Sequence, residues 1–247
     1  MLAKFALKVN KLLRHVGVQI NRSPTGAEWR RIRLMEANAI DTVVDIGANE
    51  GQYAERLREM GYRGSIHSYE PLPEVFARLS ARSRADSKWH VFEAAVGETA
   101  ASVTLNVAAN TESSSILTIA QRHLDAAPEA KTVSTVTVRA TTLDDILRPL
   151  SAHRTMLKID TQGYEDRVLA GGAAGLHKVQ MLEIELSLCE VYSEQVLFRD
   201  MDARIVAAGF RLASLAEAFT DFRTGELLQV DAIYVRRDAA GRDTAMT

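Results

Sequence analysis

The sequence predicts an α/β fold with a seven-stranded, mostly parallel sheet and helices on both faces. Two observations support this prediction. Short apolar runs alternate with helical patterns along most of the chain, and the first of these runs leads through a glycine-containing turn into a helix. Alternation of this kind requires crossover connections, which place the helices against a parallel sheet.

The composition is that of one large globular domain. The chain has 247 residues, of which 47% are hydrophobic and 25% charged, and its formal net charge is −2. A balanced charge does not indicate a nucleic-acid partner. The single cysteine, Cys189, excludes an intramolecular disulfide and is consistent with a cytoplasmic location. No apolar run approaches the roughly 20 residues that span a bilayer.

The N-terminal segment, residues 1–20, has the pattern of an amphipathic helix with lysines and Arg14 largely on one face. We expect it to pack on its own domain or on the partner of a homodimer. Peripheral contact with an anionic membrane is the alternative. The expected organisation is an N-terminal helical segment (1–40), a main domain (41–237) with an insertion at about 100–140, and a flexible tail (238–247).

The predicted elements follow in order along the chain. A helix at about Glu28–Asn38 precedes the sheet. The predicted strands are Thr42–Ile46, Gly64–Tyr69, Trp89–Phe92, Thr155–Ile159, Val179–Leu186, Phe210–Ser214 and Val230–Val235. The further predicted helices are Gln52–Met60, Pro73–Arg82, Tyr164–Ala170 and Glu194–Ala208.

Two segments interrupt the alternation of strands and helices. Ser102–Val107 and Thr132–Val138 have period-two character and predict a small antiparallel excursion. The polar stretch Asn110–Ala130 between them predicts a lid or a binding loop, because long irregular insertions in compact domains are usually functional. His123 lies in this stretch, which makes it the one histidine considered as a catalytic residue.

The first turn has the pattern G-x-N-x-G, formed by Gly47, Asn49 and Gly51 after the acid Asp45. Glu70 ends the next strand, 19 residues after Gly51, which is the spacing at which an acid reaches the hydroxyls of an adenosine ribose. Asn49 replaces the glycine that a pyrophosphate requires. The pattern therefore favours an adenosine-bearing ligand that is not a dinucleotide, such as S-adenosylmethionine. An ordinary βα turn without a ligand is the alternative.

Polar residues also follow the later strands, where ligands of open α/β sheets bind. Glu93 and Ala94 follow the third strand and are positioned to frame an adenine ring. Asp160 follows the fourth strand and is the candidate for orienting or deprotonating an acceptor hydroxyl. The alternative for Asp160 is a helix N-cap.

Glu183 and Glu185 share one face of the fifth strand, so they lie at the cleft or pair with Lys158 or arginines. A divalent metal held by Asp160 with Glu185, Asp231 or a histidine is less favoured, because no close ligand spacing is present.

Several of these blocks resemble the FkbM family of S-adenosylmethionine-dependent methyltransferases. The resemblance extends from about Asp41 to Arg236, and the glycine turn together with Leu157–Glu165 is its most specific part. The other similar blocks are Tyr69–Pro71, Ala94–Gly97, Ser113–Leu117, Glu183–Leu186 and Asp231.

The resemblance implies the Rossmann-like, seven-stranded class I methyltransferase fold and methylation of hydroxyl oxygens of sugars or polyketide-type products. It implies a cofactor site formed by Asp45, Gly47, Asn49, Gly51, Glu70, Pro71, Glu93 and Ala94. It also implies an acceptor side with catalytic Asp160 and Glu185 and substrate-binding Ser114, Tyr164, Glu165 and Asp231. His123 is added to the catalytic candidates because of its position in the insertion, not because of the resemblance.

The leading hypothesis is an O-methyltransferase that acts on a small-molecule or glycan hydroxyl. A nucleotide-dependent oxidoreductase that binds NAD is the alternative enzyme, and Asn49 in the turn argues against it. A protein of the same fold that binds the cofactor without catalysis is the third hypothesis.

Overall fold

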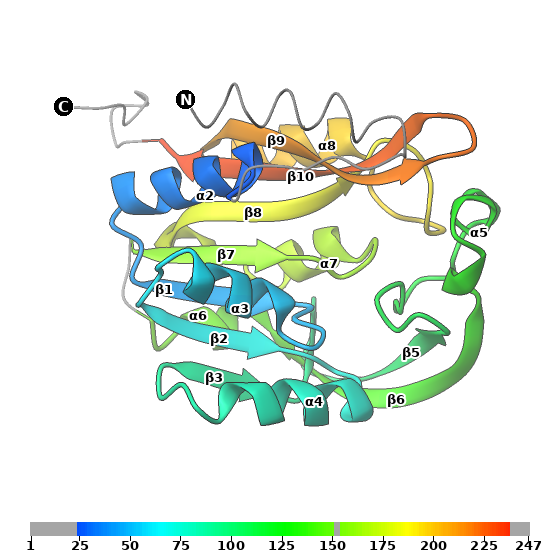
Figure 1. The fold of residues 1–247 in the computed structure, drawn as a ribbon, viewed down its shortest axis with the longest axis horizontal. Coiled ribbons are helices and arrows are strands. Elements are labelled where there is room, and N and C mark those ends of the chain that lie inside the picture. Colours follow the sequence, from blue (N-terminus) through cyan, green and yellow to red (C-terminus); the bar gives the residue numbers. More distant parts are fainter. Residues whose placement is uncertain (1–23, 151–153, 238–247) are drawn as a thin grey trace, which may run out of the picture.

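The computed structural model describes residues 24–150 and 154–237, and its main feature is a seven-stranded sheet (Figure 1). The strand order is β3-β2-β1-β7-β8-β10-β9, in which β10 is antiparallel to both of its neighbours and the other pairs are parallel. The strands are β1 (Thr42–Ile46), β2 (Ser65–Tyr69), β3 (Trp89–Phe92), β7 (Thr155–Ile159), β8 (Val179–Ser187), β9 (Phe210–Asp221) and β10 (Glu226–Arg236). The predicted α/β architecture is confirmed.

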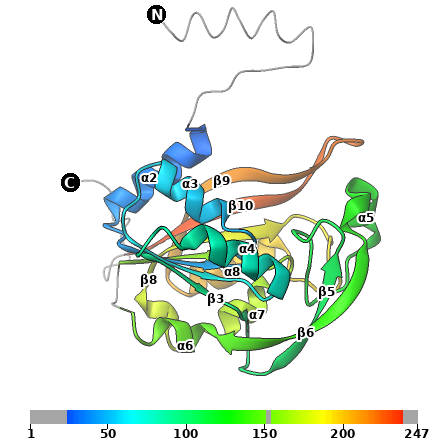
Figure 2. The ribbon, with the colours of Figure 1, turned by 60° about the horizontal axis from the view of Figure 1, so that its bottom comes forward.

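Helices cover both faces of this sheet (Figure 2). One face is covered by α2 (Gly26–Ala37), α3 (Gln52–Glu59) and α4 (Pro73–Ser83), and the other by α6 (Leu143–Leu147), α7 (Glu165–Ala170) and α8 (Phe198–Ala207). Neighbouring residues of one strand serve the two cores, because Val43 points to the first set of helices and Val44 to the second. Each buried aliphatic side chain of this size stabilises the fold by about 1.5–3 kcal/mol.

A second, three-stranded sheet extends from the carboxyl end of the main sheet (Figure 1). It consists of β4 (Ala95–Gly97), β5 (Ser102–Ala108) and β6 (Thr132–Thr142), with β5 and β6 antiparallel as predicted. The helix α5 (Gln121–Ala126) and the short 3-10 helix η2 (Pro128–Ala130) lie between β5 and β6. A further 3-10 helix, η3 (Leu176–Lys178), precedes β8.

The C-terminal hairpin is longer than its apolar residues predicted. β9 extends to Asp221 instead of Ser214, and β10 begins at Glu226 instead of Val230. The added length mixes exposed and buried residues of both apolar and polar types, so hydrophobic periodicity does not mark it. Asp231 therefore lies within its strand rather than at the beginning.

The helix predicted within residues 1–20 and the tail at 238–247 lie outside the described residues. The second predicted helix is α2, which begins after a capping box in which Thr25 and Glu28 exchange hydrogen bonds. Among the residues that the structure describes, no helix has the length and apolar character to cross a membrane.

Candidate functional site

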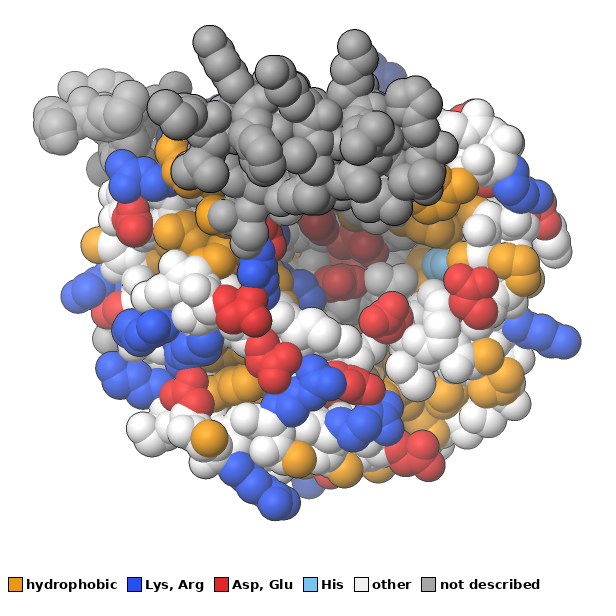
Figure 3. Space-filling view, in the orientation of Figure 1, with side chains coloured by type: hydrophobic (Ala, Val, Ile, Leu, Met, Phe, Trp, Pro, Cys, Tyr) orange, Lys and Arg blue, Asp and Glu red, His pale blue; other side chains and the backbone are white. Residues whose placement is uncertain are grey.

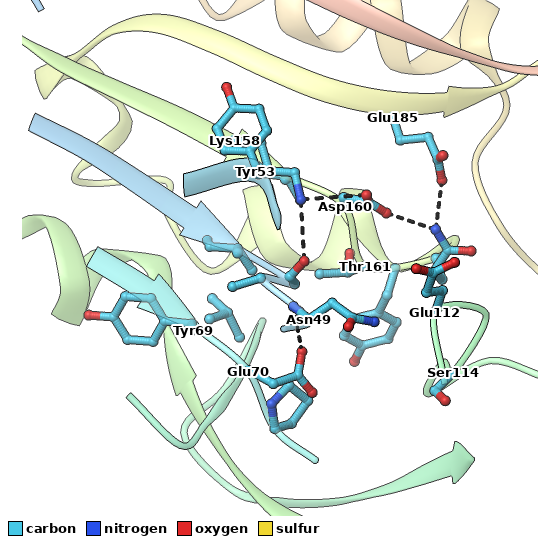
Figure 4. Close-up of a pocket in the computed structure, with 18 of the residues that line it drawn as sticks. Asn49, Tyr53, Tyr69, Glu70, Glu112, Ser114, Lys158, Asp160, Thr161 and Glu185 are labelled. Carbon is cyan, nitrogen blue, oxygen red and sulfur yellow. Dashed lines mark hydrogen bonds and ion pairs between the residues drawn. The ribbon is translucent and has the colours of Figure 1, made fainter. Parts of the chain in front are cut away.

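A cavity of about 690 Å³ lies at the carboxyl ends of β1, β2, β7 and β8. Acidic side chains gather in the hollow of this face of the molecule (Figure 3). Residues from the glycine turn, the ends of β2, β7 and β8, and the insertion line the cavity together (Figure 4). The predicted cleft at the strand ends is therefore present.

The turn after β1 approaches the turn after β7 very closely. Gly47 has a φ of 76°, and a Cβ at this position would collide with the carbonyl oxygen of Asp160. The amide of Asp160 in turn donates to the carbonyl of Ile46 at 3.0 Å. Glycine is needed at position 47 both for its backbone conformation and for this contact.

The N–H groups of the same turn are all used within the protein. Those of Gly47 and Ala48 donate to the carbonyl of Tyr69, and that of Gly51 donates to Ala48. The amide of Asn49 donates to Glu70 Oε2, and that of Glu50 donates to Asn49 Oδ1. A phosphate cradle requires free N–H groups, and residues 47–51 of the turn offer none.

Glu70 lies at the end of β2 with its carboxylate between two backbone amides. Oε2 accepts from Asn49 at 3.0 Å and Oε1 accepts from Leu72 at 2.9 Å. Burial raises the pKa of Glu70 to about 7 although both amides favour its charged form. Each oxygen keeps a second lone pair for a hydroxyl donor.

Lys158 lies between two carboxylates on the floor of the cavity. Its Nζ is 3.4 Å from Asp45 Oδ1 and 3.5 Å from Asp160 Oδ2, and it donates to the carbonyl of Gly47 at 3.2 Å. Burial opposes its charge, but Asp160 and Asp45 raise the pKa of Lys158 above its usual value. One buried ammonium therefore lies within ion-pair distance of both acids at the floor of the cavity.

Glu183 is paired with an arginine from the helix that precedes the sheet. Arg31 of α2 donates to both carboxylate oxygens, and Tyr53 Oη donates to Oε2 at 2.8 Å. The predicted pairing of Glu183 with a basic residue is confirmed, and the partner comes from α2 rather than from a strand. This buried pair fixes α2 at one wall of the cavity.

Gln162 bridges the two carboxylates predicted to be catalytic. Its Nε2 donates to Asp160 Oδ1 at 2.7 Å and to Glu185 Oε2 at 3.0 Å, and Gln229 donates to the same Glu185 oxygen at 2.8 Å. Burial, Asp160 and Glu165 raise the pKa of Glu185 well above its usual value. Burial and the neighbouring Glu183 and Asp160 raise the pKa of Asp231 to about 7.

The structure brings most of the predicted site residues to the cavity and leaves a few away from its lining. Those that line it are Gly47, Asn49, Glu70, Pro71, Ala94, Ser114, Asp160, Tyr164, Glu185 and Asp231. Asp45 and Gly51 lie behind it, where Asp45 contacts Lys158 and Gly51 packs on Trp89. Glu93 is exposed beside the cavity.

Two predicted residues have neighbours other than the cavity. The Glu165 carboxylate accepts from the amides of Thr161 and Gly163 and so supports the turn after β7. The helix after that turn begins at Glu165, and the Asp160 side chain does not cap it, so the N-cap interpretation of Asp160 is wrong. His123 is buried against Tyr192 and Phe219, and burial lowers its pKa.

The cavity residues that were not identified as site residues from the sequence include Arg31, Tyr53, Lys158 and Gln162. Lys158 and Gln162 lie within Leu157–Glu165, the block that contains Asp160. The resemblance of this block to the family was the signal that could have identified them. Arg31 gave no signal, because its partner Glu183 is 152 residues away in the chain. Among the described residues, no three His, Cys, Asp or Glu side chains are grouped to hold a metal ion.

Comparison with known proteins agrees with this fold. The sheet and its helices form a Rossmann-like methyltransferase fold. The methyltransferase FkbM domain matches residues 45–212, more than half of the chain. The chain therefore belongs to the FkbM methyltransferase family.

Two relatives illustrate the degree of similarity. The 2-O-methyltransferase NoeI of Sinorhizobium fredii (strain NBRC 101917 / NGR234) is 24% identical over 187 residues, which are 72% of this chain and 77% of NoeI. The crystal structure of methyltransferase FkbM from Methylobacillus flagellatus KT superposes with a TM-score of 0.51 at 17% identity. That alignment covers 80% of this chain but only 44% of the solved one, so this chain spans less than half of its length.

Proposed function

We propose that this protein transfers the methyl group of S-adenosylmethionine to a hydroxyl oxygen of a sugar, a glycoconjugate or a polyketide-like natural product. The observation that carries the proposal is the cavity at the strand ends, where Glu70 and Asp160 face the same space from β2 and β7. Membership of the FkbM methyltransferase family supports the reaction type, and the name of NoeI supports oxygen as the acceptor atom.

The donor set on one side of the cavity fits an adenosine-bearing cofactor. Glu70 retains lone pairs for the two ribose hydroxyls, and the Asn49 side chain and Ala94 lie beside it at the same opening. The cofactor supplies an activated methyl group on a cationic sulfur, and the surrounding carboxylates favour a cation. The absence of free N–H groups in the turn favours this ligand over NAD.

The position of Asp160 supports a role in receiving and holding an acceptor hydroxyl. Its carboxylate is partly exposed to the cavity, while Lys158 and Gln162 occupy its inner side. A carboxylate in this position accepts a hydrogen bond from the hydroxyl, aims its oxygen, and takes the proton as the new bond forms. Methyl transfer by in-line displacement requires little more from the protein than this positioning.

The acceptor side favours a compound with several hydroxyl groups. Ser114 and Glu112 from the insertion face the carboxylates of Asp160 and Glu185 across the cavity. Oxygen atoms arranged in this way accept hydrogen bonds from neighbouring hydroxyls. A polyhydroxylated ring can satisfy several of these groups at once, which is the reason for placing sugars first among the acceptors.

The proposal is tested by titrating the purified protein with S-adenosylmethionine, S-adenosylhomocysteine and NAD in a calorimeter. We expect binding of both sulfur compounds and none of NAD. Transfer of labelled methyl groups to a panel of sugars and natural-product alcohols then tests the reaction. Binding of NAD alone would support the oxidoreductase, and cofactor binding without transfer to any hydroxyl would support the non-catalytic protein.

A further inference from the structure

The side-chain amide of Gln162 is hydrogen-bonded through both its oxygen and its nitrogen. Its side-chain oxygen accepts from Tyr192 Oη at 2.6 Å, while its side-chain nitrogen uses both hydrogens on Asp160 and Glu185. Its backbone carbonyl accepts from Ser115 Oγ at 2.7 Å. With the amide in this orientation, every hydrogen of the side chain has a partner, so the side chain has one preferred position.

The backbone of the turn is left-handed at Gln162 and Gly163, so it also depends on the contacts around these two residues. Gln162 has a φ of 57°, which is unfavourable for a residue with a side chain. Gly163 follows with a φ of 94° and lies so close to Tyr192 that a Cβ would be 2.8 Å from the Tyr192 Cβ. Tyr192 is fully buried, and its burial raises its pKa, so the hydroxyl remains a donor.

The insertion is connected to the same side chains. Tyr192 Oη lies 3.1 Å from the carbonyl of Ser113, and Ser115 bonds to the Gln162 backbone. Between these two serines lies Ser114, and Glu112 precedes them. Both line the acceptor side of the cavity. One tyrosine and one glutamine therefore connect the carboxylates of the main sheet to the acceptor loop of the insertion.

We propose that Gln162, held by Tyr192, is a positioning residue that sets the direction of the Asp160 and Glu185 carboxylates and their register with the loop Glu112–Ser115. The proposal rests on the proposed function for its catalytic consequence, although the bridge itself exists without turnover. Tyr192 does not line the cavity, and Gln162 lines it with its amide nitrogen bonded to both carboxylates. Their effect reaches the acceptor through Asp160 and the insertion.

The first test measures the bridge without any acceptor. In ¹⁵N-labelled protein, the side-chain amide of Gln162 is assigned by its loss in Gln162→Leu. We expect its hydrogen exchange to be at least about tenfold slower than that of the exposed Gln121 side chain, and to become fast in Tyr192→Phe. Rapid exchange in the wild-type protein would overturn the proposal, whether or not the protein methylates a hydroxyl.

The second test measures the consequence for the reaction. We expect Tyr192→Phe to lower kcat at least about tenfold while the Kd of S-adenosylhomocysteine changes less than about twofold. Tyr234→Phe is the matched control, because its buried hydroxyl donates to Asp202 at 2.8 Å on α8. We expect wild-type kcat for this control. A loss of kcat equal to that of Tyr192→Phe would show a general effect of losing a buried hydroxyl and would overturn the proposal.

The outcomes separate this proposal from the proposed function. Slow exchange of the Gln162 amide with unchanged kcat in Tyr192→Phe would overturn the positioning role and leave the function intact. Slow exchange in a wild-type protein that binds the cofactor but methylates no hydroxyl would support the bridge and reject the function.

Discussion

Glu70 and Asp160 are both acids at strand ends, but their surroundings give them different tasks. The Glu70 carboxylate accepts hydrogen bonds from the backbone amides of Asn49 and Leu72, and so stabilises the turns that follow β1 and β2. Asp160 is held by side chains, Lys158 and Gln162, and one side of it remains open to the cavity. Substituting the two residues should therefore separate binding from turnover.

For Asp160→Asn we expect kcat to fall by roughly 10²–10⁴-fold, the usual contribution of a positioned base. The Kd of S-adenosylmethionine should change little, because the cofactor contacts lie on the β2 side. Asp166→Asn on α7 is the control, since Asp166 does not line the cavity. Steady-state kinetics and calorimetry measure the two quantities. Loss of cofactor binding in Asp160→Asn would contradict the acceptor role.

For Glu70→Ala we expect weaker cofactor binding by on the order of 1–3 kcal/mol, because hydrogen bonds to a charged group are lost. Calorimetric titration with S-adenosylhomocysteine measures this change. The exposed Glu74 on α4 provides the control variant Glu74→Ala, whose affinity should equal that of the wild type. Equal affinity in Glu70→Ala would refute the ribose contact.

The sequence predicted the acids of the cavity better than their partners. Glu70 and Asp160 directly follow strands, and Glu185 shares one face of β8 with Glu183, so their places on the predicted strands pointed to them. Arg31 and Tyr53 reach Glu183 across 152 and 130 residues, and only the folded chain brings them together. The bridge made by Gln162 depends on its left-handed backbone, for which a glutamine gives no warning.

At the level of elements, the closest contact in the site is between the turns after β1 and β7. We expect Gly47→Ala to destabilise the protein by clearly more than the roughly 1–2 kcal/mol that alanine costs in a left-handed conformation. Gly61→Ala is the matched control, because Gly61 has a φ of 96° and a Cβ added there would meet no heavy atom within 4 Å. Urea unfolding compares the two. Equal losses would contradict the contact with Asp160.

The strands β1, β3 and β7 were predicted with the observed bounds, because each is a short, mostly apolar run ended by a polar turn. β4 has only three residues, and α5 and α6 have six and five, so each is too short for a periodic signal. In the outer part of the β9–β10 hairpin, buried positions include the polar residues Asp221 and Gln229 and exposed positions include Leu215, so apolar and polar residues do not alternate regularly.

For the whole molecule, the buried acids make stability depend on pH. Burial raises the pKa of Glu70, Glu165 and Asp231 to about 7, above the values near 4 of an unfolded chain. Between about pH 4 and 7 these groups bind more protons in the folded state than in the unfolded state. Their contribution to the free energy of unfolding is therefore lost as pH rises through this range. His67 and His123 act in the opposite direction, because burial lowers their pKa.

A single substitution isolates this effect from the histidines. We expect Asp231→Asn to become more stable relative to the wild type as pH rises from 5 to 7.5, by at least about 1 kcal/mol. Urea unfolding of the ligand-free protein at several pH values measures the difference. The exposed Asp200 on α8 provides the control Asp200→Asn, which is measured over the same pH series. A constant difference for Asp231→Asn would contradict the raised pKa.

The pairing of Arg31 with Glu183 also determines how much of the chain a functional domain must include. The family match covers 45–212, but Arg31 precedes it and β10 follows it. A gene fragment limited to that match would encode a buried Glu183 without its guanidinium and a β8 with an open edge, where unpaired backbone groups invite aggregation. A chimaera made by recombination between relatives should therefore fold only when α2, the glycine turn and the C-terminal hairpin come from the same parent.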